Sequence, residues 1–148
     1  MAEHNSCIEA LAVRCDVSNE EDVKQLVAKT LETFGALHIL INNAGDLLER
    51  RVLAEMSDAF IESVLRVNLH SALYCCRAAI PLLRRGTQPS IVNVSSLAAH
   101  NGGGNGAVLY ATAKGAILTF TRGLAKELAP EIRVNGIAPG LILTDFHR

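Results

Sequence analysis

The sequence predicts a single α/β domain built around a parallel sheet. Apolar runs of strand length alternate four times with segments of helical periodicity, and those segments are long enough for right-handed crossovers between parallel strands. The 148 residues suit one domain with a sizeable core, and no repeat, linker or low-complexity stretch divides them. We therefore expect one domain over residues 1–148.

The first strand and helix are expected near the N-terminus. Residues 10–17 (ALAVRCDV) form a short apolar run typical of a buried strand. Ser18 and Glu21 have the spacing of a capping box, which predicts that a helix begins at Ser18. One apolar stripe follows at helical spacing, formed by Val23, Leu26, Val27, Leu31 and Phe34. Gly35 suits the position just after the helix end.

The second strand and helix follow directly. Residues 37–41 are a continuous apolar run, which predicts a strand buried on both faces. This strand leads into the segment Asn42-Asn43-Ala44-Gly45. Ser57 is predicted to cap a long helix that continues to about Leu83.

Two further strands surround the last helix. The β-branched run over 91–96 predicts the third strand, and a glycine-rich loop over 101–106 leads into a helix over roughly 108–128. Residues 132–138 predict the fourth strand, which stops at Pro139.

Composition excludes several classes of function. Hydrophobic residues make up 49% and charged residues 20%, and the net charge is −1, so nothing favours nucleic acid or an anionic membrane as a partner. The Arg50-Arg51 and Arg84-Arg85 pairs are too short for basic tracts, and we interpret them as solvated loop and helix ends. No apolar run reaches the ~18 residues of a membrane span, and the N-terminus has no signal-peptide core.

Cysteine and histidine usage indicates a reduced protein. The four cysteines form no disulfide framework, because Cys75 and Cys76 are adjacent on a predicted helix and point to different faces. The five histidines form no metal-ligand spacing with them. We expect a cytoplasmic protein without a metal site.

Each predicted strand ends in a polar or glycine-bearing cluster. These clusters are Asp16-Val17-Ser18, Asn42 to Gly45, Ser95-Ser96 and Pro139-Gly140. Because the carboxyl ends of parallel strands meet at one edge of a sheet, ligands collect there. The sequence therefore predicts a ligand site at this edge.

Tyr110 and Lys114 are the strongest pair of candidate catalytic residues. Four positions apart on a helix, they share one face, so the ammonium lies beside the phenol. Proton transfer near neutral pH requires lowering the tyrosine pKa of about 10 by ~3 units, which corresponds to about 4 kcal/mol. The alternative is an ordinary Tyr-Lys pair on a helix surface.

Asn68 and Ser96 each allow two interpretations. Asn68 falls on an otherwise apolar helix stripe, where a buried amide needs hydrogen-bond partners. It is either a structural residue satisfied by backbone or part of a site. Ser96, at the end of the third strand, is either a helix cap or loop hydroxyl, or a catalytic group.

Taken together, these residues resemble the short-chain dehydrogenase/reductase family, in its classical type similar to 3-oxoacyl-ACP reductases. Four motifs occur in the family's order: N-N-A-G (42–45), V-S-S (94–96), Y-x-x-x-K (110–114) and N-x-x-x-P-G-x-x-x-T (135–144). The resemblance implies an incomplete doubly wound, Rossmann-like sheet. It also implies an oxidoreductase that transfers hydride between NAD or NADP and a secondary alcohol or ketone.

The resemblance assigns a role to each catalytic candidate. Tyr110 would be the general acid/base, and Lys114 would lower its pKa and hold the nicotinamide ribose. Ser96, with Ser95 as runner-up, would hydrogen-bond the substrate oxygen. Asn68 would support a water in the proton relay.

The resemblance likewise assigns cofactor contacts. Asp16 and Val17 would meet the adenine, and Ile142 and Thr144 would lie near the nicotinamide amide. The remaining residues assigned to the cofactor are Asn43, Ala44, Gly45, Tyr110, Lys114, Pro139 and Gly140.

The sequence departs from the family at both ends. It contains no T-G-x-x-x-G-x-G turn for the pyrophosphate, and the family's first two strands and its C-terminal end have no counterpart. The strand over 37–41 would then expose a long apolar edge. We expect poor stability and impaired NAD(P) binding, and the sequence decides neither NAD against NADP nor the substrate.

The resemblance also bears on assembly. A full-length member would form a homodimer or homotetramer. The alternative to an enzyme is a catalytically inactive fragment that acts as an oligomerisation scaffold through the helices over 57–83 and 108–128.

Overall fold

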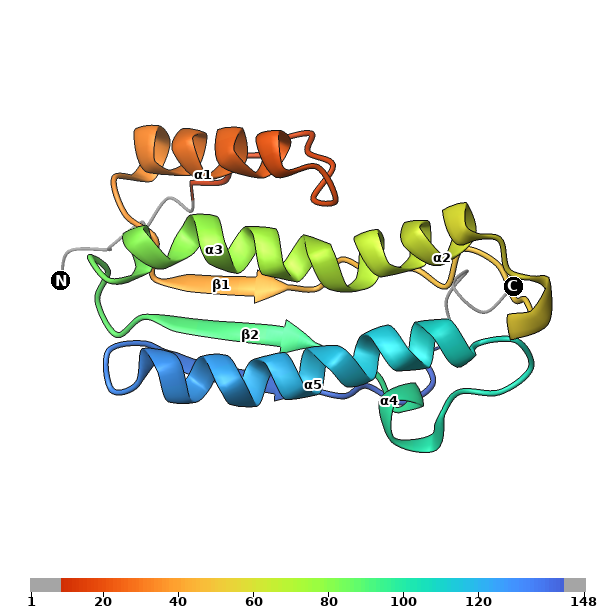
Figure 1. Ribbon diagram of the computed structural model, residues 1–148. Coiled ribbons are helices and arrows are strands. Elements are labelled where there is room, and N and C mark those ends of the chain that lie inside the picture. Colours follow the sequence, from red (N-terminus) through yellow and green to blue (C-terminus); the bar gives the residue numbers. More distant parts are fainter. Residues whose placement is uncertain (1–8, 143–148) are drawn as a thin grey trace, which may run out of the picture.

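The protein is an open parallel sheet with helices packed along it (Figure 1). The computed structural model describes residues 9–142. The strands, in the spatial order β1-β2-β3, are β1 (Ile39–Asn42), β2 (Ser90–Val94) and β3 (Arg133–Ile137), all parallel. The α-helices are α1 (Glu20–Phe34), α2 (Asp58–Leu65), α3 (Ser71–Leu83), α4 (Ala98–Asn101) and α5 (Val108–Leu128), with a 3-10 turn η1 (Leu53–Glu55) and a π turn η2 (Arg66–His70). The predicted α/β class with a parallel sheet is confirmed.

Helices α3 and α5 supply the core on one face of the sheet. Ile91 of β2 and Val134 of β3 are buried there in a cluster with side chains of both helices. The helical members of the cluster are Cys76, Ala79, Leu83, Leu124 and Leu128, joined by Ile132 just before β3. Burial of each large aliphatic side chain contributes about 1.5–3 kcal/mol, so this cluster holds the sheet and the two helices together.

The opposite face of the sheet is open among residues 9–142. Ile39 and Ile41 of β1 are 57% and 62% exposed, and Ile137 of β3 is 51% exposed. The prediction that the strand over 37–41 is buried on both faces is therefore wrong. The reason is that α3 and α5 pack on one face only, whereas a strand buried on both faces needs helices on each. The predicted apolar edge is present, because β1 ends the sheet.

The core cluster allows a direct test of stability. Ile91→Ala is expected to lower the free energy of unfolding by about 2–5 kcal/mol, because the side chain is fully buried and leaves a cavity. Ile137→Ala, on the open face of the neighbouring strand, is the matched control and should cost less than about 1 kcal/mol. Urea unfolding followed by circular dichroism measures both, and equal losses would contradict this assignment of the core.

The N-terminal segment differs from its prediction. Residues 10–17 form no strand and are mostly exposed, because a strand needs a hydrogen-bonded neighbour and no described strand lies beside them. Asn19, rather than Ser18, caps α1: its Oδ1 accepts from the backbone N–H of Glu21 and Asp22 at 2.9 and 3.4 Å. The Ser18 hydroxyl instead donates to Asp16 Oδ1 at 2.7 Å.

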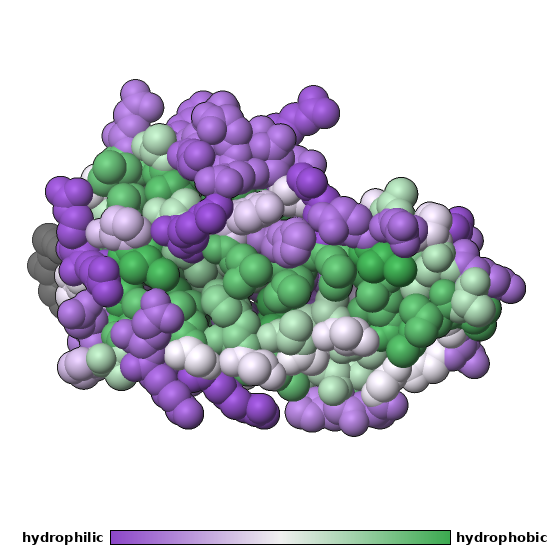
Figure 2. All heavy atoms as spheres, viewed as in Figure 1, coloured by the Kyte–Doolittle hydropathy of each residue, from purple (hydrophilic) through white to green (hydrophobic). Residues whose placement is uncertain are grey.

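The remaining predicted helices agree with the structure. Gly35 closes α1 in the left-handed conformation, with its N–H on Leu31 O at 2.8 Å. The Ser57 hydroxyl caps α2, and α2, η2 and α3 together form the predicted long helix to Leu83. The helix expected over 108–128 is α5. Figure 2 shows apolar residues gathered in a band across α3 and α5, beside the polar side chains of α1.

Residues 9–142 contain neither a membrane-spanning helix nor a metal-binding cluster. No helix there is long and apolar enough to cross a bilayer, and no group of three or more His, Cys, Asp or Glu side chains is placed to hold a metal ion. Cys15, Cys75 and Cys76 are free thiols, while Cys7 lies outside the described residues. Burial raises the pKa of Cys75 to about 11 and that of Cys76 to about 12, which favours the unreactive thiol form.

Candidate active site

A chain of hydrogen bonds through two asparagine amides supports the carboxyl ends of the strands. Asn42 Nδ2, at the end of β1, donates to Asn93 Oδ1 on β2 at 2.8 Å. Asn93 Nδ2 donates in turn to the Thr121 hydroxyl of α5 at 3.0 Å, and that hydroxyl donates to Ile117 O at 2.7 Å. Because each buried polar group has a partner, this chain of hydrogen bonds fixes the position of β1 and β2 relative to α5.

The π turn η2 turns Asn68 toward the loop that follows β1. Within this turn the Asn68 Nδ2 donates to Val64 O at 3.0 Å. The same amide donates to Asp46 O at 2.6 Å and accepts from Asp46 N at 3.1 Å. Asn68 is therefore buried with every polar atom satisfied, and it holds the loop in place.

Lys114 lies directly behind this loop. Its Nζ donates to Val94 O, at the end of β2, at 3.0 Å. A Cβ added at Gly45 would lie 2.7 Å from the Lys114 Nζ and 2.9 Å from Asn68 Oδ1, so a larger residue there would displace these two side chains. Burial lowers the pKa of the Lys114 ammonium to about 8.

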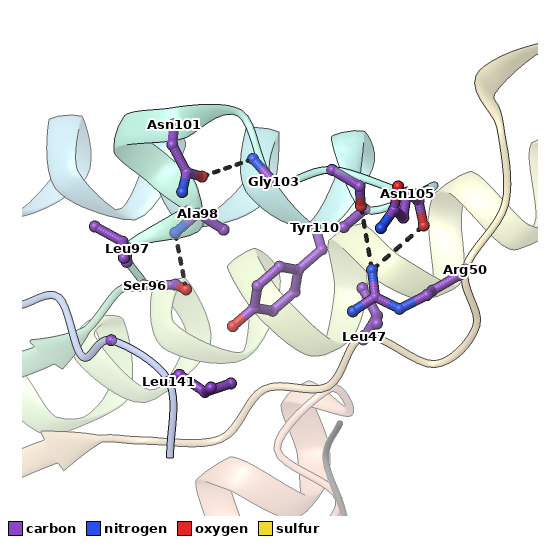
Figure 3. A pocket seen from close by; sticks show the side chains of 13 residues that line it. Leu47, Arg50, Ser96, Leu97, Ala98, Asn101, Gly103, Asn105, Tyr110 and Leu141 are labelled. Carbon is purple, nitrogen blue, oxygen red and sulfur yellow. Dashed lines mark hydrogen bonds between the residues drawn. The ribbon is translucent and has the colours of Figure 1, made fainter. Parts of the chain in front are cut away.

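Tyr110 lies one turn before Lys114 on α5. The Lys114 Nζ is 5.9 Å from the centroid of the Tyr110 ring. The predicted proximity of ammonium and phenol is thus present in the fold. In Figure 3 the Tyr110 hydroxyl points toward the same space as the Ser96 hydroxyl.

The two serines at the end of β2 differ in their environment. The Ser95 hydroxyl is buried and donates to Lys114 O at 2.7 Å, which ties β2 to α5. The Ser96 hydroxyl accepts from Ala98 N at 3.1 Å and caps the turn into α4, as one of its two interpretations expected. Ser96 also lines both cavities described next, whereas Ser95 lines only the second of them.

Two adjoining cavities of about 310 and 290 Å³ open at this edge of the sheet. Ser96, Tyr110 and Gly140 line both. Further residues of the first cavity include Leu47, Arg50, Leu97, Ala98 and Leu141, and those of the second include Asn43, Gly45, Lys114, Pro139 and Ile142. The Tyr110 phenol and the Ser96 hydroxyl therefore lie between the two cavities, with the Lys114 ammonium near the Tyr110 ring.

The comparison with known families agrees with this geometry. A family model described as short chain dehydrogenase matches residues 1–148. The chain belongs to the short-chain dehydrogenase family.

Curated members of the family are similar over most of this chain. The NADPH-dependent aldehyde reductase 1 of Arabidopsis thaliana chloroplasts is 39% identical over 138 residues, which cover 92% of this chain and 46% of that protein. The 3-oxoacyl-[acyl-carrier-protein] reductase FabG of Chlamydia pneumoniae is 42% identical over 134 residues, covering 90% and 53%. The chain spans about half the length of the curated relatives it matches.

Solved short-chain dehydrogenase structures share the fold. The ligand-free aldohexose dehydrogenase of Thermoplasma acidophilum has a TM-score of 0.86 at 33% identity, over 90% of this chain and 52% of that one. The NADH-dependent reductase A1-R′ complexed with NAD has a TM-score of 0.84 at 36% identity, over 88% and 57%. These neighbours show that the three described strands belong to a Rossmann-like fold that is incomplete here.

The fold of this short-chain dehydrogenase brings together some of the predicted cofactor residues. The second cavity is lined, together with Tyr110 and Lys114, by five more of them: Asn43, Gly45, Pro139, Gly140 and Ile142. The other predicted residues, Asp16, Val17 and Ala44, line neither of the two cavities, and Thr144 lies outside the described residues.

Asp16 has a polar environment of its own. It lines a separate cavity before α1, and hydrogen bonds from Ser18 hold the pKa of its carboxyl below the ordinary range. Its predicted contact with adenine stays a prediction.

Sequence reasoning missed part of this short-chain dehydrogenase site. Arg50, interpreted only as a solvated loop charge, is exposed but also lines the first cavity. The π turn that orients Asn68 was not predicted either, since no residue pattern marks it. Leu97 and Leu141 share the first cavity although 44 positions separate them, so no local signal identifies them.

Proposed function

We propose that this chain carries the hydride-transfer centre of an NAD(P)-dependent oxidoreductase that acts on secondary alcohols or ketones. The observation that carries the proposal is the position of Tyr110 and Ser96 on the wall shared by the two cavities, with the Lys114 ammonium behind the phenol. The likeness to reductases and dehydrogenases of the same family supports it.

The residues of the second cavity fit the nicotinamide half of the cofactor. Gly45 allows the loop after β1 to approach the Lys114 Nζ closely, and Ile142 adds an apolar wall. Lys114 and Asn43 would hold polar groups of the nicotinamide riboside there, and the bound nicotinamide would supply or accept the hydride. The sequence contains no glycine-rich turn for the pyrophosphate, so weak binding by this chain alone stays a prediction.

Proton transfer in the reduction direction follows from the side chains. Ser96 donates a hydrogen bond to the substrate carbonyl oxygen and stabilises its developing negative charge. As hydride reaches the carbonyl carbon, Tyr110 donates its phenolic proton to that oxygen. The ammonium of Lys114 stabilises the resulting phenolate. Oxidation of an alcohol reverses each transfer.

The two serines provide the test. Ser96→Ala is expected to lower kcat for NAD(P)H-dependent ketone reduction by about 10²-fold, because one donor to the developing oxyanion is lost. Ser95→Ala is the matched control and should change kcat less than about tenfold while costing about 1 kcal/mol of stability through its lost bond to Lys114 O. Turnover of each ketone in a panel is measured as the decrease in NAD(P)H absorbance that accompanies oxidation of the cofactor. Greater loss in Ser95→Ala would contradict the assignment.

A non-catalytic oligomerisation scaffold is the second candidate. The apolar band across α3 and α5 in Figure 2 supports it, because an apolar surface of this kind suits association of helices. Sedimentation that reveals a stable oligomer, together with no turnover of any ketone, would favour the scaffold over the enzyme.

A further inference from the structure

Arg50 places a fixed positive charge on the rim of the first cavity. Its Nη1 donates to Gly104 O at 3.1 Å and to Asn105 O at 3.3 Å, so two backbone carbonyls orient the guanidinium. Over residues 9–142, no carboxylate forms an ion pair with it. The charge is held in position without being neutralised.

Its neighbour Arg51 shows the contrast. The Arg51 guanidinium pairs with Glu49 at 2.6 Å and stacks over the Phe60 ring at 4.7 Å from the centroid. The charge of Arg51 is thus neutralised by the neighbouring Glu49 carboxylate, and the Arg51 side chain does not line the cavity. The two adjacent arginines therefore differ: Arg51 connects Glu49 and Phe60 within the fold, whereas the guanidinium of Arg50 remains available to bind an anion.

The remaining donors of Arg50 suit a carboxylate. Both carbonyl bonds use Nη1, which leaves the edge formed by Nε–H and Nη2–H, and that edge binds no acceptor within the described part of the chain. Two parallel N–H groups match the two oxygens of a carboxylate. Figure 3 shows the other terminal nitrogen on the side of Tyr110. Because the carbonyls already orient the group, little side-chain entropy remains to be lost on binding.

The wall between Arg50 and the Ser96 hydroxyl is mainly apolar. Its apolar side chains are Leu47, Leu97, Ala98, Ala107 and Leu141, and Asn101 and Asn105 are its polar members besides Arg50, Ser96 and Tyr110. The cavity of about 310 Å³ thus offers a site for an oxygen at one end, a largely apolar wall, and a cation on its rim. These features complement a small molecule with a carbonyl, a short hydrocarbon body and an anionic end.

We infer that the first cavity selects oxoacids and the matching hydroxyacids, with the substrate carboxylate on the Nε and Nη2 edge of Arg50. The inference rests on the proposed function for the identity of the carbonyl site. The binding of the carboxylate itself requires neither cofactor nor turnover.

Binding of a probe pair tests the inference on the 148-residue chain. Hexanoate and its neutral isostere hexanamide are titrated separately, and the methyl resonances of Leu97 and Leu141 are followed by NMR. We expect hexanoate to bind about tenfold more tightly than hexanamide, a modest ratio because Arg50 is exposed to solvent. Arg50→Gln should bring the ratio close to one, Arg50→Lys should keep part of it, and Arg51→Gln should leave it unchanged.

Two outcomes would overturn the inference: equal affinity for the two probes in the unmodified chain, or a preference for hexanoate that persists in Arg50→Gln. A purely structural role of Arg50 in joining the two loops would weaken both probes alike and leave their ratio intact. Loss of ketone turnover in the serine variants reports on the proposed function alone, so failure of one proposal is distinct from failure of the other.

Discussion

Tyr110→Phe is expected to lower kcat for ketone reduction by about 10²–10⁴-fold, the range for loss of a positioned general acid. The substitution removes a single oxygen atom and keeps the ring that lines both cavities. Binding of substrate should therefore change little while proton donation is lost. Steady-state NAD(P)H oxidation over a broad panel of ketones measures kcat and KM separately.

The chain supplies its own control for this prediction. Its only other tyrosine, Tyr74 on α3, lies 6.0 Å from the His70 ring and near the Arg77 guanidinium, and lines neither cavity. Tyr74→Phe should leave kcat within about twofold of the unmodified protein, since the half-buried Tyr74 lies away from the site and the change removes one oxygen atom only. Turnover that is insensitive to Tyr110→Phe would rule out the proposed mechanism.

Lys114→Met is expected to lower kcat by at least about 10²-fold, because no ammonium then stabilises the Tyr110 phenolate. The same change should raise the free energy of unfolding at pH 7 by about 1–3 kcal/mol. Burial of the ammonium costs stability, and the hydrogen bond to Val94 O only partly offsets that cost. A more stable and less active variant is the expected result.

The pH dependence of unfolding follows from the same burial. The pKa of Lys114 is lowered from 10.5 to about 8 in the folded protein. Between these values the unfolded chain binds more protons than the folded one, so the contribution of this lysine to stability increases as pH rises from 8 to 10.5. The gain is on the order of 3 kcal/mol.

Chemical denaturation across this pH range measures the gain as a difference between variants. Lys126→Met, at an exposed position on the same helix, should keep the pH dependence of the unmodified chain, whereas Lys114→Met should lack it. Identical pH profiles for the two variants would show that the fold does not lower the pKa of Lys114.

Much of the site could be predicted because its strongest signals are local. Tyr110 and Lys114 share a helix face by their spacing alone, and α5 has the bounds that its periodicity indicated. The amide of Asn68 was correctly expected to need partners, and the structure supplies Val64 O and the Asp46 backbone. The catalytic roles of these residues remain proposals that the substitutions above test.

Other features were beyond local reasoning because they depend on contacts between distant segments. The prediction of a strand over 10–17 failed because strand formation needs a partner, whereas the apolar pattern describes only the strand itself. The cap of α1 shifted by one residue, from Ser18 to Asn19, because Asp16 engages the serine hydroxyl. Serine and asparagine are both favoured at helix N-caps, so residue preference alone could not choose between Ser18 and Asn19.

The sequence by itself determined the alternation of strands and helices, the family motifs and the helix that carries Tyr110. Hydrophobic periodicity and side-chain spacing depend on neighbours along the chain, so they are visible without coordinates. Only the tertiary structure decided that Ser96 lines both cavities while the Ser95 hydroxyl is bonded to Lys114 O, that Gly45 makes room for Lys114, and that Arg50 forms no ion pair within residues 9–142. Each of these depends on which atoms from remote segments come within hydrogen-bond distance, and that is set by packing.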